Sequence, residues 1–136
     1  MSNKMYVPRI ELEGLVLEVP TNSIIDSIIK YYRSNRKYLG KYAATVNQCF
    51  MDHEFWISKI CAMHNDYEED KACNFCILND RRDVIGVINY FNIIRGAFHC
   101  CILGYSLDES RQGRGIMART LSESIKYMFD KKHSSY

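Results

Sequence analysis

The sequence has neither a long apolar run nor a strong bias in charge. No stretch approaches the roughly 18 apolar residues of a membrane-spanning helix, and the N-terminal MSNKMYVPRIELEG has no apolar segment typical of a signal peptide. Lysine and arginine number 18 against 16 acidic residues, and the basic residues form no stripe. These absences argue against a membrane protein, a secreted protein and a nucleic-acid-binding protein.

Internal repeats, low-complexity segments and linkers are missing as well. The 136 residues are 47% apolar and 25% charged, an ordinary composition for a globular protein. A chain of this length can bury one hydrophobic core of useful size but not two. We therefore expect a single domain over residues 1–136.

The six cysteines show neither a secreted disulfide framework nor a complete zinc site. Cys73 and Cys76 have the C-x2-C spacing of metal ligands, but no second pair follows at a usual spacing, so we expect no metal. The alternative is that they lie on the two faces of a buried strand. Cys100 and Cys101 are adjacent within an apolar run. Without a secretion signal, the pattern indicates reduced thiols in a cytoplasmic protein.

Apolar periodicity divides the chain into strands and helices. Strands are expected at residues 15–19, 73–78, 84–91 and 98–107, and helices at 23–35, 52–66 and 113–131. The polar turn at 79–83 makes the second and third strands an antiparallel hairpin. This order predicts an α/β domain of the α+β layered kind, with a mixed, mostly antiparallel sheet flanked by helices.

Local signals refine these elements. Residues 21–23 offer N-cap side chains to the first helix and Asp52 to the second, and residues 35–40 break the first helix. The strand at 98–107 is apolar on both faces, which favours a central or fully covered position. In the last helix the apolar stripe is expected to contain Met117, Leu121, Ile125 and Met128, with Phe129 beside it.

The segment SRQGRGIM, residues 110–117, joins the last predicted strand to the last predicted helix. The first N–H groups of a helix have no partner within the helix and carry the positive end of its dipole. Gly113 and Gly115 allow a phosphate to approach these groups, and Arg111 and Arg114 add positive charge. A simple tight turn before the helix is the alternative. The Walker and Rossmann glycine patterns are both absent.

With its flanks, this segment resembles the acetyl-CoA loop of the GNAT superfamily of N-acetyltransferases. Residues 112–117, QGRGIM, match the pattern Q/R-x-x-G-x-G/A at Gln112 and Gly115. Met117 replaces the last Gly or Ala, as in the ribosomal-protein-alanine branch of the RimJ/RimL type. Residues 83–99 resemble the central hairpin of that branch, and LGYS at 103–106 resembles its pantetheine-lining strand. The resemblance covers most of residues 12–133.

The resemblance implies transfer of an acetyl group from acetyl-CoA to an amine, most of all the N-terminal alanine of a ribosomal protein. It implies that a backbone N–H near Leu107 polarises the thioester carbonyl. Asn89, Phe91 and Arg95 are the implied contacts to the acceptor peptide. The implied cofactor-binding residues are Tyr105, Ser106, Leu107, Gln112, Gly113, Arg114, Gly115, Ile116 and Met117.

Two residues of the last predicted strand are candidates for catalysis. His99 and Tyr105 stand at even spacing, so they share a face if no bulge intervenes. A histidine there has the chemistry to relay a proton. The alternative roles are a packed strand histidine for His99 and a lining of the acceptor or pantetheine cleft for Tyr105.

The fold that this sequence resembles continues beyond the last predicted helix with further strands and a helix. We therefore expect residues 1–136 to form its N-terminal, acetyl-CoA-binding portion, truncated at the C-terminal side. The apolar strand at 98–107 would then have an unpaired edge, and such edges recruit other chains, so self-association is expected. A catalytically inert acyl-CoA-binding or interaction module is the alternative function, and a phosphate loop for another nucleotide is a third.

Overall fold

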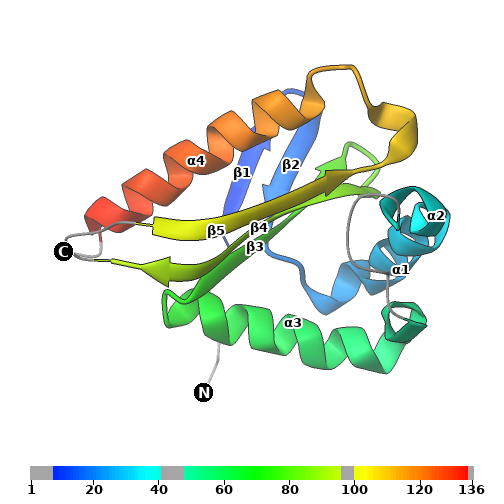
Figure 1. Cartoon of the computed structure of the whole chain (residues 1–136), viewed down its shortest axis with the longest axis horizontal. Helices are drawn as coiled ribbons and strands as arrows, with labels where there is room; N and C mark the ends of the chain where they lie inside the picture. Colours follow the sequence, from blue (N-terminus) through cyan, green and yellow to red (C-terminus); the bar gives the residue numbers. More distant parts are fainter. Residues whose placement is uncertain (1–7, 41–47, 96–99, 135–136) are drawn as a thin grey trace.

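A five-stranded antiparallel sheet organises the chain, with the strands in the order β1-β2-β3-β4-β5 (Figure 1). The computed structural model describes residues 8–40, 48–95 and 100–134. The antiparallel hairpin predicted across residues 79–83 is confirmed, and so is the layered arrangement of sheet and helices. The strands are β1 Arg9–Leu12, β2 Leu15–Glu18, β3 Ala72–Asn79, β4 Val84–Ile94 and β5 Cys100–Leu107.

Strand β1 was not predicted from the sequence. It pairs with β2 through a turn in which Gly14 has a φ of 75°, a conformation that favours glycine. The carboxylate of Glu18 on β2 accepts hydrogen bonds from Arg9 on β1 and from Arg82 in the β3–β4 turn. The sequence pattern that could have predicted β1 is the alternation Arg-Ile-Glu-Leu before a Glu-Gly turn.

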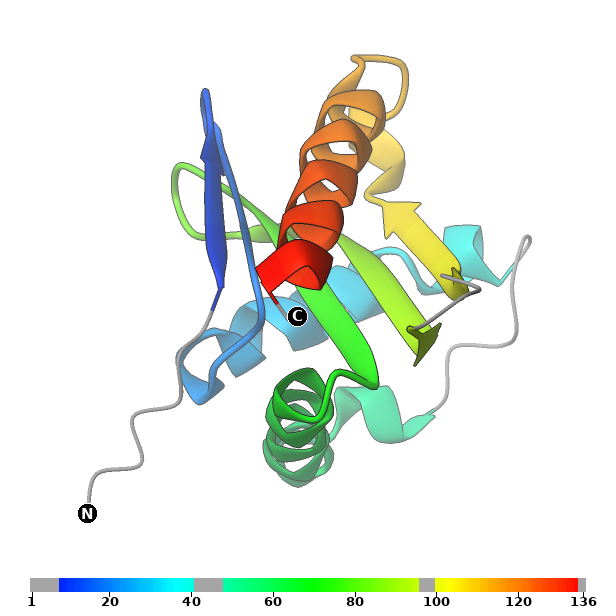
Figure 2. The same ribbon diagram turned by 90° about the vertical axis from the view of Figure 1, so that its left-hand side faces the viewer.

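Helices cover both faces of the sheet (Figure 2). Helices α1 and α3 lie on one face, whereas α4 crosses the other. None of the helices in the described ranges is long and apolar enough to cross a lipid bilayer. The helices are α1 Ile25–Ser34, α2 Arg36–Leu39, α3 His53–Glu68 and α4 Ile116–Ser134, with 3-10 turns η1 Asn22–Ile24, η2 Gln48–Met51 and η3 Glu109–Arg111.

The helix ends confirm one predicted cap and correct the other. Asp52 accepts the N–H of Glu54 at the start of α3, as expected. Thr21 caps nothing, because its hydroxyl bonds to that of Ser23 instead of to a backbone N–H. The break of the first helix predicted at residues 35–40 is confirmed, since α1 ends at Ser34, and Arg36–Leu39 form the separate short helix α2.

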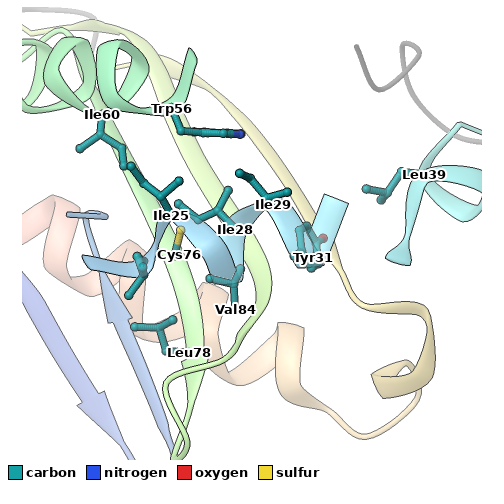
Figure 3. Close-up of a cluster of buried hydrophobic side chains, with 11 residues drawn as sticks. Ile25, Ile28, Ile29, Tyr31, Leu39, Trp56, Ile60, Cys76, Leu78 and Val84 are labelled. Carbon is teal, nitrogen blue, oxygen red and sulfur yellow. The ribbon is translucent and has the colours of Figure 1, made fainter. Parts of the chain in front are cut away.

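Two hydrophobic clusters stabilise the two faces. Side chains of α1 and α3 pack on Cys76, Leu78 and Val84 of the sheet (Figure 3). On the other face Cys73, Phe75 and Ile77 form a cluster with Met128 of α4. Cys73 and Cys76 therefore lie on opposite faces of β3, as the alternative to a zinc pair predicted.

The buried face of α4 differs from the predicted stripe. Met128 is buried, but Ile125 is 40% exposed, whereas Thr120 and Ser124 are fully buried. Their hydroxyls tolerate burial because each has a partner: Thr120 donates to the carbonyl of Ile116, and Ser124 bonds to the hydroxyl of Tyr90. Helix α4 also begins at Ile116 rather than at residue 113.

Candidate functional site

Strand β5 forms an edge of the described sheet. This position corrects the central or covered strand expected from the apolar pattern, and it agrees with the unpaired edge expected from the family resemblance. Strand β5 pairs only with β4 among the described strands, and five of its eight residues are exposed. Ile102 is 49% exposed and Tyr105 is 55% exposed. The apolar residues on both faces of β5 therefore reflect a surface that the described residues do not cover.

The outer edge of β5 offers backbone groups to a ligand. The N–H of Asp108 donates to the carbonyl of Ile85 at 2.8 Å. Because hydrogen-bonded and non-hydrogen-bonded pairs alternate in an antiparallel ladder, the backbone groups of Tyr105 and Leu107 then point away from β4. Gln112 confirms this direction, since its side-chain amide donates to the carbonyl of Leu107 at 3.0 Å. The N–H of Leu107 remains directed towards the open edge.

The loop after β5 presents a run of unpaired backbone N–H groups. Gly113 and Gly115 have φ values of 79° and 74°, and no atom stands within 4 Å of where their side chains would begin. These left-handed conformations keep residues 113–115 out of α4. Within the described part of the chain, the N–H groups of residues 113–118 have no hydrogen-bond acceptor, and the first to find one is that of Arg119. This arrangement suits a phosphate or diphosphate.

The arginines of the loop differ in availability. Arg114 is exposed between the two glycines, next to the unpaired N–H groups. The Arg111 side chain points back to Asp108, with its Nε at 3.8 Å from the Asp108 carboxylate. Arg119 donates to the carbonyl of Glu13 in the β1–β2 turn. Of the three, Arg114 is therefore best placed to neutralise a bound anion.

The residues expected to bind an acceptor peptide do not all meet in one place. Asn89 and Phe91 line a pocket of about 340 Å³ between the sheet and helices α1 and α3. Asn89 accepts a hydrogen bond from Asn74 in this pocket. Arg95 instead lines a groove on the α4 side, where it forms a two-pronged ion pair with Asp70.

Tyr105 lies on the opposite face from Asn89. The register pairs Tyr105 with Ile88, whose side chain belongs to the core beneath α4, and pairs Asn89 with Gly104. The structure thus separates the catalytic candidate Tyr105 from Asn89 and Phe91 by the thickness of the sheet. His99, the other catalytic candidate, lies outside the described residues.

Two residues near the loop were missed in the sequence. Tyr31 and Asn35, both on or next to α1, are 3% and 2% exposed and make hydrogen bonds to residues that flank the loop. The spacing of four residues on an otherwise apolar helix face was a weak signal. Their partners, about 75 positions further along the chain, could not be read from it.

Comparison with known proteins agrees with the geometry. A sequence model described as acetyltransferase (GNAT) domain matches residues 15–135. The chain is 28% identical to the Escherichia coli [ribosomal protein uS5]-alanine N-acetyltransferase over 130 residues, which cover 93% of this chain and 67% of that protein. This chain thus spans about two thirds of the length of that relative.

Solved structures show the same fold. The ribosomal-protein-S5-alanine acetyltransferase from Vibrio fischeri superposes with a TM-score of 0.86 and 28% identity, over 92% of this chain and 69% of that one. Mycobacterium smegmatis RimJ in complex with CoA-disulfide superposes with a TM-score of 0.76 and 16% identity, over 90% and 61%. The chain belongs to the acetyltransferase (GNAT) domain family, and its loop and strand edge have the donors that the cosubstrate acetyl-CoA requires.

Proposed function

We propose that this chain transfers the acetyl group of acetyl-CoA to the α-amine of a protein N-terminus, with the N-terminal alanine of a ribosomal protein as the favoured acceptor. The observation that carries the proposal is the run of unpaired N–H groups at residues 113–118 beside the open edge of β5. The acceptor class is proposed from the names of the similar proteins.

Each part of acetyl-CoA has a proposed counterpart. Residues 112–117 hold the pyrophosphate, with Gln112 shaping the loop by its bond to Leu107 and Arg114 supplying charge. The backbone around residues 105–107 pairs with the pantetheine arm, and the N–H of Leu107 polarises the thioester carbonyl. Acetyl-CoA supplies the activated acyl group, and the residues of this chain orient it towards the amine.

The acceptor is proposed to enter from the face of α1 and α3. Asn89 and Phe91 line the pocket there, whose aromatic walls also include Tyr32 and Trp56. A direct contact from Arg95 requires its ion pair with Asp70 to open. His99 and Tyr105 remain candidates for proton transfer.

Release of CoA tests the proposed reaction. Incubation of the chain with acetyl-CoA and a peptide that begins with Ala is expected to release free thiol, measured with DTNB, while the same peptide with an acetylated N-terminus releases none. Binding of acetyl-CoA without release on either peptide would contradict acetyl transfer and support the catalytically inert acyl-CoA-binding module.

We further propose that residues 1–136 correspond to the N-terminal, acetyl-CoA-binding portion of one GNAT domain, because the chain spans about two thirds of its relatives. A cytoplasmic location is proposed since ribosomal proteins are the acceptors named for those relatives. Self-association through the strand predicted at 98–107 is proposed because its described part, β5, exposes an apolar edge without Lys, Glu or Pro.

A charge on this edge is expected to disrupt self-association. Leu103→Lys should convert the chain to monomers in size-exclusion chromatography with light scattering, because a lysine on an edge strand opposes strand pairing. Ile57→Lys on α3 is the matched control, since Ile57 and Leu103 are 37% and 38% exposed. A wild-type chain that elutes as a stable monomer would contradict the proposal.

A further inference from the structure

Helix α1 and the residue that follows it contact the proposed acetyl-CoA segment at two points. The hydroxyl of Tyr31 lies 2.6 Å from that of Ser106 near the end of β5. The side-chain oxygen of Asn35 accepts the N–H of Glu109 at 2.9 Å, where η3 begins. Tyr31 and Asn35 stand four residues apart and therefore project from the same side. Between the two contacts lies Leu107, whose N–H faces the open edge.

The side chains that make both contacts are buried, and the two contacts support each other. Tyr31 and Asn35 are 3% and 2% exposed, and the side-chain amide of Asn35 also donates to the carbonyl of Tyr31 at 2.9 Å. Asn35 thus uses both ends of its amide, which fixes its orientation. Burial raises the pKa of Tyr31 to about 12, although its bond to Ser106 opposes the rise, so the phenol keeps its proton at neutral pH. If either bond breaks while Tyr31 and Asn35 are present, a buried side-chain polar group loses a partner.

A third polar contact of α1 differs from those of Tyr31 and Asn35 in the segment to which it attaches the helix. Ser27 accepts the N–H of Val84 at 2.7 Å, which attaches the same helix to the start of β4. Val84 lies outside the loop and outside β5. The Ser27 contact therefore holds the helix on the sheet, whereas the Tyr31 and Asn35 contacts hold residues 106–109.

We propose that Tyr31 and Asn35 are positioning residues for acetyl-CoA. By fixing residues 106 and 109 to one side of α1, they keep the N–H of Leu107 and the N–H groups of residues 113–118 in a constant relation. The N–H of Leu107 faces the thioester, and the N–H groups of residues 113–118 face the pyrophosphate. The inference rests on the proposed function, since both contacts are assigned a role in binding acetyl-CoA. Neither the Tyr31 nor the Asn35 side chain needs to touch acetyl-CoA for this role.

Affinities for two ligands separate the two contacts. CoA spans the loop and the β5 edge, whereas adenosine 3′,5′-bisphosphate lacks the pantetheine arm and the phosphate attached to it, and reports on the loop alone. Asn35→Ala is expected to weaken binding of both by about fivefold to tenfold, because the start of the loop loses its attachment. Tyr31→Phe should weaken CoA by about fivefold and leave the bisphosphate unchanged, as measured by calorimetry.

Ser27→Ala is the matched control, because it removes a bond of similar burial from the same helix. It should lower the melting temperature and leave both affinities unchanged. Tyr31→Phe preserves the packing of the ring, so it keeps the inference testable if Asn35→Ala does not fold. Equal affinities in wild type, Tyr31→Phe and Asn35→Ala would overturn the inference.

Hydrogen exchange distinguishes failure of the inference from failure of the proposed function. If the wild-type chain binds no CoA, the proposed function is wrong. Exchange of the Glu109 N–H then tests only whether Asn35 holds this segment in place. Asn35→Ala should then accelerate exchange of the hydrogen-bonded N–H groups of residues 108–112 more than Ser27→Ala does. Equal exchange in both variants would show that Asn35 does not position this segment.

Discussion

Replacing Gly86 with alanine is expected to destabilise the domain by about 2 kcal/mol and to displace β5. A β-carbon at this position would stand 2.7 Å from the carbonyl oxygen of Ser106, with side-chain atoms of Ile77 and Leu107 at 3.0 and 3.1 Å. A backbone oxygen cannot rotate away, so β5 has to move and carries Leu107 with it. Urea unfolding followed by the fluorescence of Trp56, the single tryptophan, measures the loss.

Gly104→Ala provides the control on the opposite strand of the same ladder. Its β-carbon would meet only a ring atom of Phe91 at 3.7 Å, an ordinary contact. The change in the free energy of unfolding should stay within about 0.5 kcal/mol. CoA affinity is also expected to fall in Gly86→Ala and not in Gly104→Ala. Similar losses in both variants would contradict the close approach of β4 and β5 at Gly86.

Gly115→Val is expected to reduce CoA affinity at least about 100-fold, which corresponds to about 2.7 kcal/mol. Gly115 has a φ of 74°, a conformation that a β-branched residue adopts only under strain. Relief of that strain rotates the backbone, so the N–H groups of residues 113–118 no longer point to a common ligand. Isothermal titration with CoA measures the change.

The turn between β1 and β2 offers a matched control for this variant. Gly14 has a φ of 75° and, like Gly115, has no atom within 4 Å of where a side chain would begin. Gly14→Val should therefore cost a similar strain, roughly 1–2 kcal/mol of stability, with CoA affinity unchanged. Equal loss of affinity in the two variants would show that it follows from instability and that the loop is not the pyrophosphate site.

Features that depend on neighbouring residues could be predicted from the sequence. The β3–β4 hairpin follows from two apolar runs around the polar turn at 79–83, and the cap at Asp52 follows from one side chain next to the start of a helix. The glycines of residues 112–117 indicated the loop, and their positive φ values agree with that prediction. In each case the interacting groups lie within a few positions of one another.

Features that depend on what covers a surface could not be predicted in this way. The apolar residues of β5 do not reveal whether a strand, a helix or water lies beside them. Their pattern favoured a covered strand, whereas β5 is an edge of the described sheet, as only the family resemblance led us to expect. Thr120 and Ser124 are buried only because Ile116 and Tyr90 supply hydrogen-bond partners. Strand β1, with four residues, is stable through its pairing with β2 rather than by its own composition.

The sequence by itself determined the family, which matches over residues 15–135, and it predicted the loop and its ligand from the contiguous residues Gln112 to Met117. Only the tertiary structure decided which of the candidate site residues lie on each face of the sheet. The pairing of Tyr105 with Ile88 places it on the α4 face, while Asn89 faces α1 and α3. The contacts of Tyr31 and Asn35 with residues 106 and 109 likewise exist only after folding. The physical reason is that strand register and helix packing join residues far apart in sequence, which no local pattern encodes.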